Sequence, residues 1–132
     1  MEQMSMNSNL CDSLAKIFNG KGQFENGICS VTVDRHDINA SIAAKPFRAL
    51  HHMFDFESPD GSGNYLITGE MVLLENEVPG VTASLLDSDI IPSALHTHWL
   101  YDIPKLMYIH VQCIMNPVVF ANKMAQILKV RT

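Results

Sequence analysis

The residues from Ile90 to Ile114 read IIPSALHTHWLYDIPKLMYIHVQCI, and they predict how this part of the chain folds. Two stretches rich in apolar and β-branched side chains, 90–99 and 106–114, are separated by a turn predicted at Pro104. We expect them to be strands that pair as a hairpin around residues 101–105. The hairpin would be antiparallel, which is the first indication of the fold class.

Further strands and helices are predicted on both sides of this hairpin. Apolar patterning predicts strands at 28–33, 38–44, 53–57 and 65–75, the last of them central because residues 71–74 are all apolar. Helical spacing and capping residues predict helices at 10–18, near 79–87 and from 117 onward, with loops at 20–27 and 58–64. Because regular βαβ alternation is missing, we expect an α+β fold: an antiparallel sheet of about five to six strands flanked by a short N-terminal, a middle and a C-terminal helix.

The composition fits one globular domain and excludes several classes of function. The chain has 132 residues, of which 47% are hydrophobic and 17% charged, and its mean hydropathy is +0.07. We interpret residues 1–9 as a flexible tail and 10–132 as a single domain. The net charge is −5 and no run of Lys and Arg occurs, so nucleic acid is not an expected partner.

Location and assembly are also predicted from composition. No apolar run is long enough to span a membrane, and the polar start lacks the apolar core of a signal peptide, so we expect a cytoplasmic protein without a membrane partner. Cys11, Cys29 and Cys113 are an odd number without a close pair, which favours small buried side chains over a disulfide framework. The low charged fraction predicts that another copy covers part of the apolar surface, as in a homodimer.

The hairpin carries the strongest functional signal of the chain, three histidines on two adjacent strands. His96 and His98 share one strand face, and His110 lies on the face of the next strand that also carries Tyr108. If the strands pair, the three imidazoles converge. They are the candidate metal ligands and the candidate catalytic residues, because imidazole binds zinc, iron and nickel and three protein ligands leave a position open.

Four more residues are candidates for binding a ligand at this site. They are Asp102 and Trp99 in the hairpin, and Glu70 and Glu77 along or just past the central strand. For Glu77, capping of the following helix is the favoured interpretation. The pair His51 and His52 is interpreted as surface or edge histidines, of which at most one can join the group.

Three segments of the second half resemble a known family. Residues 69–81 read GEMVLLENEVPGV, 94–99 read ALHTHW and 103–110 read IPKLMYIH. In this order they are similar to the LppY/LpqO family, a bacterial group that includes lipoproteins and is described as a domain of unknown function. Thr97, Trp99 and Lys105 depart from its pattern, while the three histidines are retained. The resemblance implies no established activity; because longer members carry two copies of the domain, it implies that a single copy pairs with itself.

Together these observations predict a domain that binds a small ligand or a divalent transition metal (zinc, iron or nickel) at His96, His98 and His110, with catalysis as an open question. Metal-free chemistry, with one histidine acting as a general base, is a variant of this hypothesis. The alternative is a non-catalytic binding or interaction module in which the histidines are structural.

Overall fold

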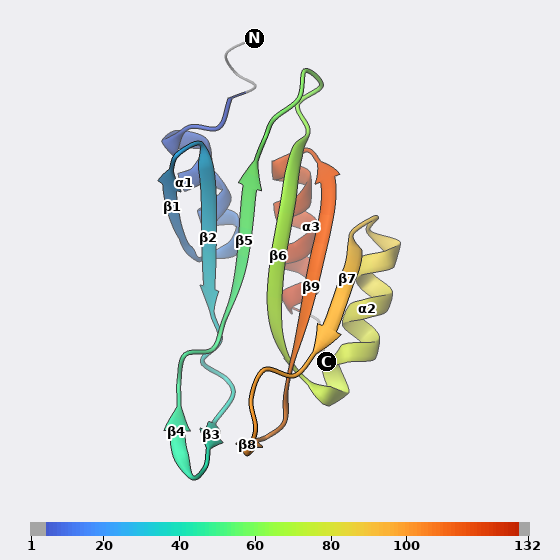
Figure 1. Cartoon of the computed structure of the whole chain (residues 1–132). Helices are drawn as coiled ribbons and strands as arrows, with labels where there is room; N and C mark the ends of the chain where they lie inside the picture. Colours follow the sequence, from blue (N-terminus) through green and yellow to red (C-terminus); the bar gives the residue numbers. More distant parts are fainter. Residues whose placement is uncertain (1–4, 130–132) are drawn as a thin grey trace.

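The protein is described by a computed structural model that covers residues 5–129. Its centre is a six-stranded antiparallel sheet in the order β1-β2-β5-β6-β9-β7 (Figure 1). The strands are β1 (Lys21–Glu25), β2 (Ile28–Asp34), β5 (His51–Glu57), β6 (Tyr65–Leu74), β9 (Leu106–Met115) and β7 (Ile91–His96). A small sheet of β4 (Lys45–Phe47), β3 (Ala40–Ile42) and β8 (Asp102–Ile103) lies at one end of the molecule.

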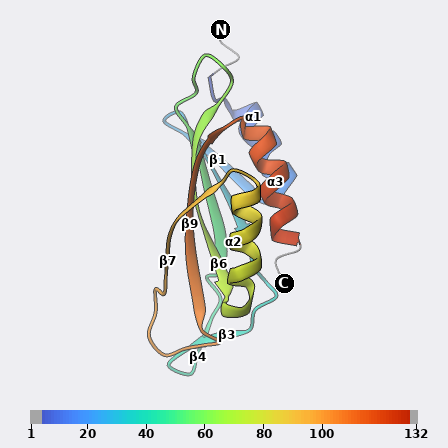
Figure 2. The ribbon, with the colours of Figure 1, turned by 90° about the vertical axis from the view of Figure 1, so that its right-hand side faces the viewer.

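Three helices lie on one face of the large sheet and bury the main core against it (Figure 2). They are α1 (Ser8–Phe18), α2 (Val78–Asp87), preceded by the 3-10 turn η2 (Glu75–Glu77), and α3 (Pro117–Lys129). Phe54 and Phe56 of β5 point inward to Phe120 of α3, with ring centroids 5.7 Å apart in both pairs. The residues between them, Met53 and Asp55, occupy the opposite face, as the period of two requires. The α+β fold with three flanking helices is therefore confirmed.

The small sheet covers one end of the face that the helices leave open. Beneath it lies a second apolar cluster, in which Val72 of β6 and Tyr108 of β9 are paired neighbours. Beyond this cluster the same face becomes accessible, and Glu70 and His110 are each about one-third exposed. The boundary between the covered and the open part of the face is where the histidines lie.

The ends of several elements follow the predicted capping. Asn19 ends α1 in the left-handed conformation, and the Asn116 side chain accepts hydrogen bonds from the N–H groups of Val118 and Val119 at the start of α3. The predicted tail 1–9 overlaps α1, which begins at Ser8, and residues 1–4 lie outside the described part of the chain.

Three predictions of local structure are wrong. The loop predicted at 20–27 contains β1, whose residues are all exposed and whose single apolar residue, Phe24, gives no alternating pattern. Backbone pairing with β2 makes it a strand. The strand predicted at 38–44 is only Ala40–Ile42, and it belongs to the small sheet with the unanticipated β4. The strand predicted at 90–99 ends at His96.

The cysteines also correct the sequence analysis, because Cys11 and Cys29 form a disulfide. The packing of α1 on β1 and β2 brings two positions that are 18 residues apart to a Cα–Cα distance of 5.5 Å. Cys113 is free and buried, as expected, and burial raises the pKa of its thiol to about 11. Among the described residues, no helix is long and apolar enough to cross a membrane.

Candidate metal centre

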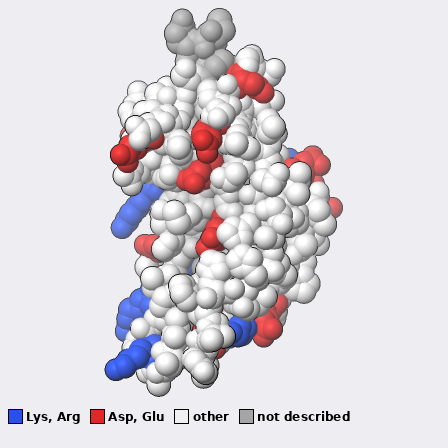
Figure 3. All heavy atoms as spheres, in the orientation of Figure 1, with Lys and Arg blue, Asp and Glu red and all other residues white. Residues whose placement is uncertain are grey.

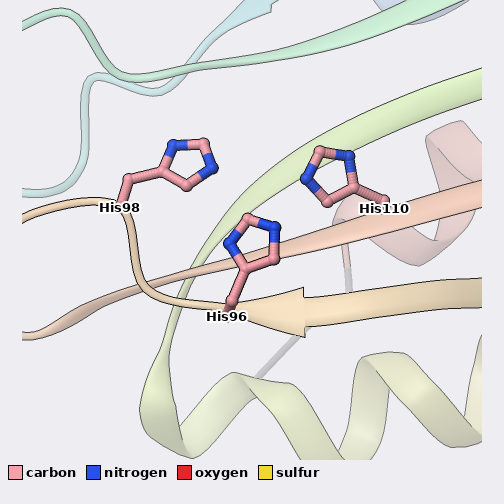
Figure 4. A group of neighbouring side chains, drawn as sticks. All are labelled: His96, His98 and His110. Atoms are coloured by element: carbon pink, nitrogen blue, oxygen red, sulfur yellow. The ribbon is translucent and has the colours of Figure 1, made fainter.

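The pairing of β7 with β9 brings the three histidines together. In this antiparallel ladder Ala94 lies opposite His110 and His96 opposite Tyr108, so His96 and His110 share the open face of the sheet. Their ring centroids are 4.9 Å apart. His98 follows the end of β7, yet its ring turns back and stacks on that of His96, also at 4.9 Å. Figure 4 shows the three rings pointing toward a common space.

The spacing of the rings suits a metal ion. One ligand atom from each of His96, His98 and His110 can be chosen so that all three lie within 4.8 Å of one another. Nitrogens bound to one tetrahedral zinc ion at about 2.0 to 2.1 Å would be about 3.3 Å apart, so the rings must close by roughly 1.5 Å at most. His96 and His98 are exposed and can make this adjustment without disturbing the core.

Aromatic contacts hold His98 in place. Its ring lies on that of Tyr108 with centroids 3.7 Å apart and an interplanar angle of 7°. The Trp99 indole N–H donates to the Tyr108 hydroxyl at 2.9 Å, and the Trp99 ring meets Phe47 of the small sheet edge-on. Burial raises the pKa of the Tyr108 hydroxyl, against a smaller opposing effect of the Trp99 hydrogen bond, so the phenol stays protonated as an acceptor. Trp99, predicted to bind a ligand, thus lies in the wall of the site.

Glu70 is the acidic candidate that the fold places beside the histidines. It lies opposite His110 in the pairing of β6 with β9, and its Oε1 is 3.7 Å from His110 Nε2. On the other side of Glu70 the open face forms a shallow pocket of about 230 Å³. The pocket is lined by Met53, Asp55, Thr68, Gly69, Glu70 and His110.

Asp102 and Glu77 bind other residues of the chain and not the three histidines. The Asp102 carboxylate accepts hydrogen bonds from the Lys105 ammonium and from the Leu106 N–H, and so fixes the turn between β8 and β9. Burial alone would raise the pKa of Asp102, but these bonds outweigh it and lower the pKa.

The Glu77 carboxylate is 2% exposed and holds the buried Arg35 through two hydrogen bonds of 2.7 and 2.9 Å. It also accepts the Leu74 N–H and so caps the 3-10 turn η2. The predicted capping of the following helix is wrong, because the Glu77 side chain makes no capping hydrogen bond to α2. Neither Glu77 nor Asp102 is a member of the group formed by the three histidines.

Two further residues differ from the sequence interpretation. His52 is not at the surface but 2% exposed, and its Nδ1 accepts a hydrogen bond from the Val72 N–H. Tyr108 was not proposed as a functional residue, although the period of two places it on the face of His110. Its role as the platform for His98 depends on the backbone turning after His96, which local patterning does not predict.

Surface charge does not suggest a nucleic-acid site. In Figure 3, lysine and arginine side chains gather mainly toward the end that carries the small sheet, and acidic side chains are spread over the rest. On this face the described residues form no continuous basic stripe, in agreement with the net charge of −5.

Comparison with known proteins gives the family. A family model described as Domain of Unknown Function (DUF1259) matches residues 12–130. The chain belongs to this family. No curated protein and no solved structure matches the chain. Because the family description gives no reaction, the function has to be argued from the site.

Proposed function

We propose that His96, His98 and His110 bind a divalent transition metal, zinc, iron or nickel, at a site open to a small-molecule ligand. The observation that carries the proposal is the convergence of three imidazoles, with ligand atoms within 4.8 Å, on an accessible sheet face. Three protein ligands leave at least one position for water or a substrate, which is the arrangement that catalytic metal sites share. The resemblance to the LppY/LpqO family is consistent with this site, since this chain retains all three histidines of the family pattern.

The exposure of the rings argues against the alternative in which the histidines are structural. His96 and His98 are exposed and His110 is about one-third exposed. A structural histidine is expected to be buried and hydrogen-bonded, as His52 is with the Val72 N–H. Exposed rings that face one another add little to packing, whereas binding of a shared metal ion would explain why the three rings converge.

Metal binding can be tested without knowing a substrate. We expect calorimetric titration of the apoprotein with Zn²⁺, Ni²⁺ or Fe²⁺ to show one site per chain, and His96→Ala and His110→Ala to lose at least roughly tenfold in affinity. His36→Ala is the matched control, because His36 is 86% exposed and its ion-pair partner is Asp34, outside the group. Melting temperatures of His96→Ala and His36→Ala should stay within about 2 °C of the wild type. No binding by the wild type, or equal binding by His110→Ala and the control, would refute the proposal.

We also propose that two copies of the chain associate through β7. This strand is at the edge of the sheet, and its side chains Ile91 and Leu95 are 54% and 49% exposed. No Asp, Glu, Lys or Arg occurs between residues 90 and 101, so charge does not protect this edge, which is interrupted only by Pro92 and the bulge beside it. Light scattering at high micromolar concentration should give the dimer mass for the wild type and the monomer mass for Leu95→Asp. A monomeric wild type would contradict this part of the proposal.

The disulfide bears on the compartment. The cytoplasmic location predicted from the sequence stays a prediction, and the Cys11–Cys29 bond weighs against it, because such bonds persist mainly in oxidising compartments. We therefore propose an oxidising environment for the folded protein. Trapping of free thiols in intact cells, before lysis, would decide between the two: one reactive thiol per unfolded chain supports the proposal, and three contradict it.

A further inference from the structure

The geometry points to Glu70 as a fourth protein ligand, so that three imidazoles and one carboxylate hold the ion; this inference rests on the proposed metal site. Glu70 is separated from the nearest of the histidines by 26 residues of sequence, and no spacing motif links it to them. What links them is the register of the sheet.

One row of paired residues runs across four strands of the open face. Met53 lies opposite Glu70, Glu70 opposite His110, and His110 opposite Ala94. Side chains in one such row point to the same face of the sheet, and directly paired positions lie within reach of each other. Glu70 is therefore brought to the imidazoles by backbone pairing in the middle of two ten-residue strands, β6 and β9.

The distance between the two side chains is close to that between two ligands of one ion. Glu70 Oε1 is 3.7 Å from His110 Nε2. Ligands bound at about 2.0 to 2.1 Å in a tetrahedron are about 3.3 Å apart, so this pair needs an adjustment of a few tenths of an ångström. Glu70 is not a member of the group whose ligand atoms lie within 4.8 Å of one another, so binding the same ion also requires its carboxylate to turn toward His96 and His98.

The electrostatics of Glu70 also fit a cation. In the part of the chain that the structure describes, Glu70 has no ion pair with Lys or Arg within 4.0 Å, and its ion-pair contact is to the His110 ring. A divalent ion bound by the three histidines would give the Glu70 carboxylate a full charge partner. The other carboxylates near the hairpin are already compensated, Asp102 by Lys105 and Glu77 by Arg35.

A ligand at this position also determines the side from which a substrate reaches the ion. Glu70 and His110 both line the shallow pocket with Met53, Asp55 and Thr68, so the pocket begins where the proposed coordination sphere ends. On the side of the small sheet, the Trp99 ring packs edge-on against Phe47. A small molecule with an oxygen that binds metals would approach over the pocket.

Cobalt(II) is the probe, because its visible absorption reports the ligands and their number. We expect the wild type to bind one Co²⁺ per chain, Glu70→Gln to bind it at least roughly tenfold more weakly, and the visible absorption bands of the Co²⁺ complex to change in Glu70→Gln because the carboxylate oxygen is lost. Glu57→Gln is the matched control, because Glu57 lies on β5 on the same face as Met53 and Asp55, but outside the pocket and the histidine group. It should leave both the affinity and the spectrum unchanged. Apo Glu70→Gln should melt within about 2 °C of the wild type, since Glu70 is one-third exposed.

Three outcomes would overturn the inference. If Glu70→Gln keeps the affinity while His110→Ala loses it, the metal site stands and Glu70 is not a ligand. If Glu70→Gln weakens binding but leaves the Co²⁺ spectrum unchanged, Glu70 acts only through its charge. If the wild type binds no Co²⁺, Zn²⁺, Ni²⁺ or Fe²⁺, both the inference and the proposed metal site fail.

Discussion

Replacing Glu77 with glutamine tests whether this carboxylate serves the fold. Glu77 accepts hydrogen bonds from Arg35 at 2.7 and 2.9 Å and from the Leu74 N–H at 2.9 Å. Both charged side chains of the pair are 2% exposed. Glutamine has the same shape but only one acceptor oxygen, and its amide would face the guanidinium of Arg35.

The expected loss of stability is large because Arg35 would keep its charge. Burial alone would lower its pKa, but the hydrogen bonds and charge interactions that Arg35 makes with Glu77 and Asp37 outweigh burial and raise it. Removing one partner of a buried ion pair costs about 3–5 kcal/mol. Asp37, whose side chain is 54% exposed, remains as a partner of Arg35, so we expect the lower end of this range, about 3 kcal/mol. In a domain of this length that corresponds to a fall in melting temperature of roughly 10 °C.

Urea denaturation and thermal melting followed by circular dichroism measure this effect. Glu75→Gln is the control, because Glu75 is exposed and two residues away. Replacing both partners, Arg35→Met with Glu77→Leu, should recover much of the loss, since no charge is then left buried alone. A Glu77→Gln protein within about 0.5 kcal/mol of the wild type would refute the argument. Weakened metal binding by folded Glu77→Gln would instead support a role at the site.

Three further predictions follow from individual contacts. Replacing both Cys11 and Cys29 with serine should lower the free energy of unfolding by about 3 kcal/mol, because the disulfide no longer constrains the unfolded chain. A reductant should destabilise the wild type by a similar amount and leave the double variant unchanged. An equal effect of the reductant on the wild type and the double variant would contradict the disulfide. The Cys113 thiol, with a pKa of about 11, should be protonated at pH 8 and react with a thiol reagent far more slowly in the native protein than after unfolding; fast labelling of the native protein would refute this. Any stability that the buried thiol contributes should be lost as the pH rises from about 9 toward 11. Tyr108→Phe removes the acceptor of the Trp99 N–H and should cost about 1 kcal/mol in urea titrations, whereas Tyr101→Phe, at a side chain 76% exposed, should cost nothing measurable.

Local patterning predicted part of the histidine arrangement. Side chains alternate with period two along a strand, which puts His110 on the same face of β9 as Tyr108, whereas His96 shares that face only through the pairing of β7 with β9. Local patterning also predicted the ends of the helices, where Asn19 and Asn116 have conformations and hydrogen bonds that depend only on nearby residues. These features were predictable because their energies arise within a few residues of sequence.

Contacts between distant segments decided the rest. β1 is a strand only because β2 offers it a backbone partner, and Cys11 meets Cys29 only because α1 packs across both strands. His98 lies beyond β7 and reaches the other rings by stacking on Tyr108 of β9.

Glu70 shows the limit most clearly. The sequence singles it out as an acidic residue on the central strand, but only the pairing of β6 with β9 places its carboxylate 3.7 Å from His110. Register between strands depends on which side chains the whole sheet buries, and a shift of one residue would turn Glu70 into the core. The sequence alone therefore determined the candidate ligands on the hairpin, while the tertiary structure decided which carboxylate stands beside them.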